Sequence, residues 1–147
     1  MLFRSKEEEA LSFVSGYTIV NDVSVPHDSV YRPAIKQKAR DGFCPVGPWI
    51  MPKECINNPN SLQIEVFING QLRQQNNTQH CIRSVTKLLA DVTEFMTLRP
   101  GDVLLTGVPE KAPLAKAGDV VRIEINGVGV LENKLVQEQD WKWGRRS

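Results

Sequence analysis

Four charged residues in the first third of the chain are candidates for chemistry: Asp22, Lys38, Arg40 and Asp41. Asp22 stands beside Asn21 in an apolar stretch that is typical of a strand. Because burial of a bare carboxylate costs free energy, a buried Asp22 would need a cation or hydrogen-bond donors. The simpler alternative is an aspartate at the frayed end of the strand. Lys38, Arg40 and Asp41 are equally consistent with a solvated cluster of charges.

The other residues that could bind metal have spacings that argue against a metal site. His27 and His80 have no cysteine or histidine at ligand spacing and are interpreted as surface histidines. Glu7 and Glu9 form a Glu-x-Glu pair, but at positions i and i+2 of a helix they point about 200° apart. In a first helical turn they are better explained by the helix dipole. No phosphate-binding loop, dinucleotide fingerprint or nucleophile elbow is present.

Length and composition bound the class of protein. The 147 residues correspond to one domain, and 41% apolar residues are enough for a core, which excludes disorder and fibres. The net charge of +1 gives no electrostatic reason to expect nucleic acid or an anionic membrane as a partner. Three widely spaced cysteines suggest neither a disulfide framework nor a zinc site. With no apolar run of membrane-spanning length and no signal-peptide pattern, we expect a cytoplasmic protein.

The N-terminal half predicts a helix, a strand and a long loop. Ser5 and Glu8 form a capping box, which predicts a helix from Ser5 that ends at Gly16. Residues 17–25 are rich in β-branched side chains and predict a strand. Residues 31–52 contain four prolines, so we expect one turn of helix and much ordered loop there.

Two hairpins are the clearest local predictions. Residues 62–68 alternate between apolar and polar, turn at Asn69-Gly70 and return over 71–75. Residues 120–125 do the same before Asn126-Gly127. Both Asn-Gly pairs predict type I′ turns, because both central residues of that turn need positive φ.

The rest of the chain predicts a helix and one more strand. Apolar residues recur at helical spacing over 82–96, and residues 103–106 predict a short buried strand. The predicted class is α+β, mainly β. We expect a domain over residues 1–136 and a polar C-terminal tail over 137–147.

Several segments carry a resemblance to a known family. GYTIVNDVS at 16–24 and LRPGDVLLTG at 98–107 resemble the fumarylacetoacetate hydrolase family. The segment YRPAIKQKARDGFCPVGP at 31–48 is most similar to the isomerase/decarboxylase branch, which acts in 4-hydroxyphenylacetate (homoprotocatechuate) degradation, and residues 69–74 and 82–85 continue the match. The resemblance covers residues 5–136. It implies the family's mixed β-sandwich roll, with the N-terminal part missing.

The resemblance also implies a chemistry. Family members bind Mg²⁺ or Mn²⁺ through a Glu-x-Glu pair and one aspartate, ligands that suit a hard cation. The metal chelates a small 2-oxo or 2-hydroxy di- or tricarboxylic acid, and the reaction passes through an enolate. By position, Asp22 matches the aspartate ligand and Lys38 the active-site lysine, which Asp41 is expected to orient. Thr106 and Gly107 match the loop that closes on the substrate.

The departures from the family pattern decide which function is expected. The Glu-x-Glu pair lies well upstream of the aspartate in the family, and here only 21 residues precede Asp22. Pro26 and Ser29 stand where many members have arginine and glutamine, and Val108 where threonine is usual. We therefore expect the C-terminal part of such an enzyme, from a truncated reading frame or a degenerate copy.

Two functions follow from this. The first is an isomerase/decarboxylase of 2-hydroxyhepta-2,4-diene-1,7-dioate and 5-oxopent-3-ene-1,2,5-tricarboxylate, active if another segment or chain supplies the two glutamates. The second is an inactive remnant that serves only as a folded or partner-binding domain. Either would leave apolar sheet surface uncovered, so a homo-oligomer is expected.

Overall fold

The computed structural model describes residues 4–27 and 34–140. Ser29, residues 31–33 and the tail residues 141–147 therefore lie outside the described residues. The strands are β1 (Gly16–Val20), β2 (Val46–Pro52), β3 (Gln63–Ile68), β4 (Gln71–Asn77), β5 (Val120–Ile125) and β6 (Gly129–Lys134). The helices are α1 (Ile35–Lys38), α2 (Val85–Phe95) and the 3₁₀ helices η1 (Glu7–Phe13), η2 (Lys53–Cys55), η3 (Thr78–His80) and η4 (Glu138–Asp140).

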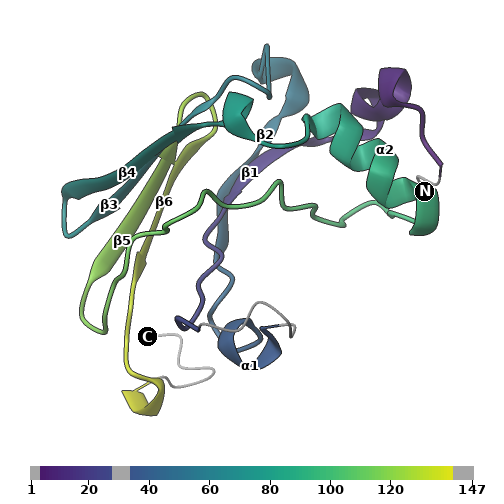
Figure 1. Ribbon diagram of the computed structural model, residues 1–147. Coiled ribbons are helices and arrows are strands. Elements are labelled where there is room, and N and C mark those ends of the chain that lie inside the picture. Colours follow the sequence, from purple (N-terminus) through teal and green to yellow (C-terminus); the bar gives the residue numbers. More distant parts are fainter. Residues whose placement is uncertain (1–3, 28–33, 141–147) are drawn as a thin grey trace.

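The strands of the described residues form two antiparallel sheets, which confirms the mainly β class. One sheet has the order β4-β3-β5-β6, and the other pairs β1 with β2 (Figure 1). Helices η1 and α2 pack beside each other, at the end of β1 that lies away from α1 (Figure 1). In the part of the chain that the structure describes, no helix is long and apolar enough to cross a membrane.

Alternation along the strands of the larger sheet builds the main core. In β5, Val121 and Ile123 are buried, whereas Arg122 and Glu124, which alternate with them, pair with each other. This period of two is the one expected for a strand with one face against a core. The buried cluster consists of Ile19, Ile56, Ile68, Val121, Ile123, Val128 and Leu131.

Both hairpins are confirmed, but only the first has the predicted turn. Asn69 and Gly70 have φ values of 51° and 77°, as a type I′ turn requires. In the second hairpin Gly127 has φ 79°, whereas Asn126 is not among the described residues with positive φ. The type I′ prediction is wrong here because Ile125 pairs with Gly129, which leaves three residues in the loop instead of two.

The prediction of loop over 31–52 is wrong in its second half. The turn of helix is present as α1, but residues 46–52 form β2, which pairs with β1 from Gly16↔Pro52 to Val20↔Val46. Prolines are tolerated here because a strand at the edge of a sheet has N–H groups that need no ladder partner. Trp49 ties β2 to the larger sheet, since its Nε1 donates to the carbonyl oxygen of Val128 at 2.8 Å.

The capping box is also wrong. Ser5 does not cap η1; its backbone N and its Oγ lie 3.2 and 2.9 Å from Oγ1 of the fully buried Thr93 in α2. The helix is 3₁₀, its N-cap is Lys6, and it ends at Phe13 instead of Gly16. Gly16 begins β1, where a Cβ would meet the carbonyl oxygen of Met51, so this glycine permits close approach of β2.

The second half of the chain differs from prediction in one element. Helix α2 confirms the periodic stretch, although Ile82 precedes the helix and is 98% exposed. The strand predicted over 103–106 is wrong, because these residues have no strand partner and Val103 is 53% exposed. They belong to a long extended segment, 98–115, that crosses from α2 to β5 (Figure 1).

Candidate functional site

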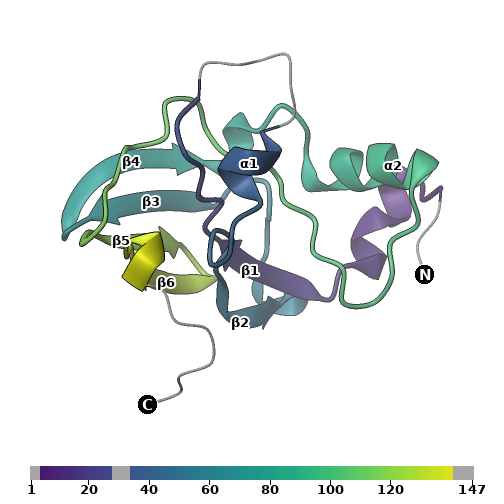
Figure 2. The ribbon, with the colours of Figure 1, turned by 90° about the horizontal axis from the view of Figure 1, so that it is seen from below.

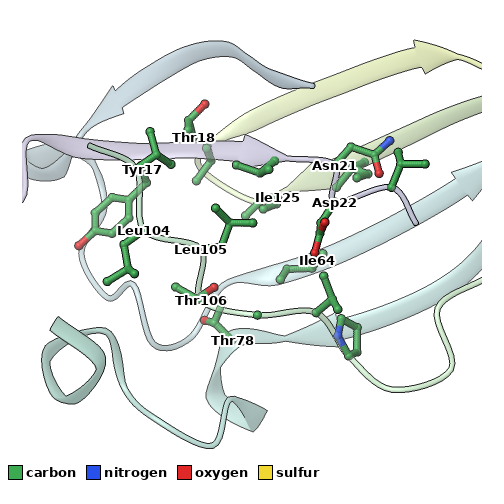
Figure 3. A pocket seen from close by; sticks show the side chains of 18 of the residues that line it. Tyr17, Thr18, Asn21, Asp22, Ile64, Thr78, Leu104, Leu105, Thr106 and Ile125 are labelled. Atoms are coloured by element: carbon green, nitrogen blue, oxygen red, sulfur yellow. The ribbon is translucent and has the colours of Figure 1, made fainter. Parts of the chain in front are cut away.

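A cavity of about 1020 Å³ lies between β1, the inner face of the larger sheet and the segment 98–115. Figure 3 shows side chains from these elements facing one another across it. The lining is mostly apolar, with a smaller number of polar groups, as is usual for ligand sites. The polar and charged residues of its lining include Tyr17, Thr18, Asn21, Asp22, His27, Lys38, Gln74, Asn76, Thr78, Arg99, Asp102 and Thr106.

Asp22 and Lys38 meet at this cavity. Lys38 Nζ donates to Asp22 Oδ2 at 2.7 Å, and both residues contribute to the lining. The Asp22 side chain is 24% exposed and that of Lys38 is 43% exposed. The partly buried carboxylate thus has the cation that its burial requires. Asp22 follows the end of β1 by two residues, so it is both at the strand end and part of a charged pair.

Backbone hydrogen bonds hold the two residues together although they are 16 positions apart. The N–H groups of Asn21 and Val23 donate to the carbonyl oxygens of Pro45 and Phe43, both at 3.0 Å. Val25 N donates to the carbonyl oxygen of Gln37 in α1, also at 3.0 Å. These bonds place α1 beside the segment that follows β1, as Figure 2 shows. Lys38, at the end of α1, therefore reaches back to Asp22.

Three further residues were predicted for the site. Thr106 and Gly107 line the same cavity from the segment 98–115, and Gly107 has φ 108°. Asp41 lies in the turn after α1, is exposed and is not part of the cavity lining. The structure therefore brings Asp22, Lys38, Thr106 and Gly107 to one cavity and leaves Asp41 outside it.

Several polar residues of the cavity were not predicted from the sequence. Gln74, Asn76 and Thr78 all line it. The spacing of two is the signal that could have identified Gln74 and Asn76, because alternate residues of a strand share a face, and Thr78 follows directly after β4. Burial raises the pKa of the Tyr17 phenol above its usual value, because a charged phenolate is disfavoured away from water. His27 is exposed, as predicted, and also contributes to the lining.

The described residues do not by themselves fit a divalent metal ion. Among them no group of three or more histidine, cysteine, aspartate or glutamate side chains is placed to hold a metal. Asp22 is a single carboxylate, and one of its oxygens already accepts from Lys38. Glu7 is engaged elsewhere, since its Oε1 accepts from Thr86 Oγ1 at 3.0 Å. A hard cation such as Mg²⁺ would need further oxygen ligands from outside this set.

Comparison with known proteins places the chain in a family. The family model described as fumarylacetoacetate (FAA) hydrolase C-terminal matches residues 2–136. A 4-hydroxyphenylacetate degradation bifunctional isomerase/decarboxylase from Salmonella dublin is 43% identical over 135 residues, which are 90% of this chain and 32% of that protein. Its matching region is the C-terminal part of the relative.

Two solved structures have the same fold. Maleylpyruvate hydrolase from Sphingobium sp. SYK-6, in complex with manganese(II) ion and pyruvate, gives a TM-score of 0.83 at 35% identity, over 92% of this chain and 49% of that one. 2-Hydroxyhepta-2,4-diene-1,7-dioate isomerase from Mycobacterium marinum gives 0.80 at 33% identity, over 92% and 53%. The chain thus spans about a third of the curated relative and about half of each solved chain. On the match over residues 2–136 and these likenesses, the chain belongs to the fumarylacetoacetate hydrolase family.

Proposed function

We propose that the protein containing these residues is an isomerase/decarboxylase of 4-hydroxyphenylacetate catabolism. Its substrates would be 2-hydroxyhepta-2,4-diene-1,7-dioate and 5-oxopent-3-ene-1,2,5-tricarboxylate. The observation that carries the proposal is the Asp22–Lys38 pair at a large cavity, in a chain 43% identical to an enzyme of that type. A cytoplasmic location fits such a catabolic role, with residues 1–136 as the catalytic part and 137–147 as a tail.

Lys38 would supply electrostatic stabilisation in this reaction. When CO₂ leaves or a double bond shifts, negative charge grows on the 2-oxo oxygen of the substrate. An ammonium group aimed at that oxygen interacts more strongly as the charge develops, which lowers the barrier. Lys38 is 43% exposed, so its Nζ has room to turn from Asp22 toward a bound acid.

The other predicted residues have supporting roles. The Thr106 hydroxyl and the Gly107 backbone would contact the substrate from the segment 98–115, which lies across the cavity from Asp22 (Figure 3). Asp41 would act indirectly by orienting Lys38, since it lies in the turn that follows α1. Because the cavity exceeds the space that a small acid fills, it also leaves room for side chains from other parts of the protein.

Metal dependence is proposed for the whole protein and not for these residues alone. One structural relative holds a manganese ion and pyruvate. Here Asp22 would be one of several carboxylates, and the others must come from outside the described residues or from a second chain. No catalytic step is assigned to a metal on the residues present.

The alternative, an inactive partner-binding domain, has one observation in its favour. Large apolar side chains are exposed on β2, where Val46 is 51%, Trp49 55% and Ile50 66% exposed. Exposed apolar surface of this kind favours association. The same feature is compatible with an enzyme that acts as a homo-oligomer, so we propose self-association under either function.

A graft distinguishes an active site from a remnant. Residues 2–136 would replace the matching C-terminal part of the Salmonella dublin relative, whose remaining part then supplies the metal ligands that the described residues do not provide. Circular dichroism and a melting curve would establish that the graft is folded. We expect CO₂ release from 5-oxopent-3-ene-1,2,5-tricarboxylate that needs added Mg²⁺ or Mn²⁺. A folded graft without turnover on either substrate would contradict the proposed function.

A further inference from the structure

Two Asn-Gly pairs of this chain have the same local sequence but different surroundings. Asn69-Gly70 connects β3 to β4, and Asn126-Gly127 begins the loop between β5 and β6. Since β3 and β5 are antiparallel neighbours, the two turns lie at opposite ends of the larger sheet. Both asparagines are exposed, so exposure alone does not distinguish them.

The side chain of Asn69 is held at both of its polar atoms. Nδ2 donates to Asp119 Oδ1 at 2.8 Å, and Oδ1 accepts from the backbone N of Val120 at 2.9 Å. The backbone is fixed as well, because Asn69 N donates to the carbonyl oxygen of Val120 at 2.9 Å. These hydrogen bonds hold the side-chain amide of Asn69 next to the first residue of β5.

Asn126 has no such restraint. Its backbone N donates to Gln63, and Val128 N donates to Ile125, but no side-chain hydrogen bond of Asn126 is found among the described residues. In the same set, the N–H of Gly127 donates to no backbone or side-chain acceptor. Glycine also carries no side chain to obstruct approach to its nitrogen. Among the described residues, no hydrogen bond therefore restrains either the side-chain amide of Asn126 or the backbone nitrogen of Gly127.

We propose that Asn126 is a site of spontaneous deamidation, whereas Asn69 is protected. The backbone nitrogen of Gly127 attacks Cγ of Asn126, forming a new C–N bond. The Cγ–Nδ2 bond breaks, and ammonia leaves with the proton from Gly127. Water then hydrolyses either carbonyl of the resulting five-membered succinimide, which gives aspartate or isoaspartate at position 126.

The isoaspartate product would disturb the contact between the two sheets. It inserts one carbon into the backbone of a loop whose flanking residues, Ile125 and Gly129, are paired. The carbonyl oxygen of Val128 in that loop accepts the hydrogen bond from Trp49 that ties β2 to β6. Modification of Asn126 would therefore weaken the anchor of β2.

The test follows both sites during storage of the native chain at mildly alkaline pH. Peptide mass spectrometry reports the mass change at each asparagine, and labelling by an isoaspartyl methyltransferase reports isoaspartate. We expect Asn126 to convert at least about tenfold faster than Asn69, the ratio expected if Asn69 must first break its two side-chain hydrogen bonds. In urea, where both pairs are unfolded, the two rates should be similar.

Two variants separate the hydrogen bonds from other causes. Asn126→Ser should remove the fast conversion and leave Asn69 unchanged. Asp119→Ala removes the acceptor of Asn69 Nδ2 and should raise the rate at Asn69. Equal native rates at the two sites, or an Asp119→Ala variant with no increase at Asn69, would each overturn the proposal.

Discussion

Replacing Lys38 by alanine in the grafted enzyme should separate catalysis from stability. Removing Lys38 should reduce the free energy of unfolding only slightly, because its ion pair with Asp22 joins side chains that are 43% and 24% exposed. Pairs of this kind contribute less than about 1 kcal/mol. The melting temperature should therefore change by only a few degrees, which a differential scanning measurement would check.

The effect of Lys38→Ala on turnover should be far larger. Removal of one group that stabilises a developing oxyanion typically lowers kcat by about 10²–10³-fold. Steady-state kinetics on 5-oxopent-3-ene-1,2,5-tricarboxylate would measure this, with metal content determined in parallel. Metal content should remain close to that of the unmodified graft, because Lys38 is not a ligand.

Lys36 provides the matched control for this experiment. It lies two residues away in the same helix and is exposed, and its side chain is not part of the cavity lining. Lys36→Ala should keep kcat within a few-fold of the unmodified graft. If Lys38→Ala also keeps its kcat within a few-fold, the catalytic assignment of Lys38 is wrong and the pair with Asp22 is only structural.

Three further predictions concern the 147-residue chain itself. Titration calorimetry should find Mg²⁺ binding no tighter than the millimolar range, since the described residues hold no group of three or more side chains placed to bind a metal, and a tight stoichiometric site would refute this. Sedimentation velocity should show oligomers or aggregates, because Trp49 and Ile50 are exposed, and a monodisperse monomer would count against it. Gly16→Ala should destabilise the fold by about 1–3 kcal/mol in urea, because its Cβ would meet Met51 O and lie 2.7 Å from Ile50 Cγ2. A loss of stability no larger than the experimental error would show that β2 can move away from β1 to accommodate the Cβ.

Local signals predicted local structure well. The first hairpin depends on alternation and on an Asn-Gly pair that tolerates positive φ, so all of its information lies within 15 consecutive residues. The N-cap of α2 is just as local, since Ser84 Oγ accepts from Lys87 N at 3.1 Å, although it was not among the predictions. The turn type predicted for the second hairpin is wrong because the pairing of Ile125 with Gly129 depends on the register of two strands.

Features that depend on distant partners could not be predicted. Ser5 has the sequence of a cap, but it bonds Thr93, 88 residues away. Strand β2 contains prolines, and only its pairing with β1 at a sheet edge makes it a strand. At the site, residue types alone left Asp22 and Lys38 open to a solvated interpretation. The resemblance assigned them, and the hydrogen bonds around α1 then brought them together.

The most direct test of the proposed site is Asp22→Asn in the grafted enzyme. Asparagine has nearly the same shape but no negative charge, so it retains the size of the side chain while removing the carboxylate. Metal-dependent release of CO₂ from 5-oxopent-3-ene-1,2,5-tricarboxylate should become undetectable while the graft remains folded. Turnover by Asp22→Asn close to that of the unmodified graft would show that this carboxylate is not part of the active site.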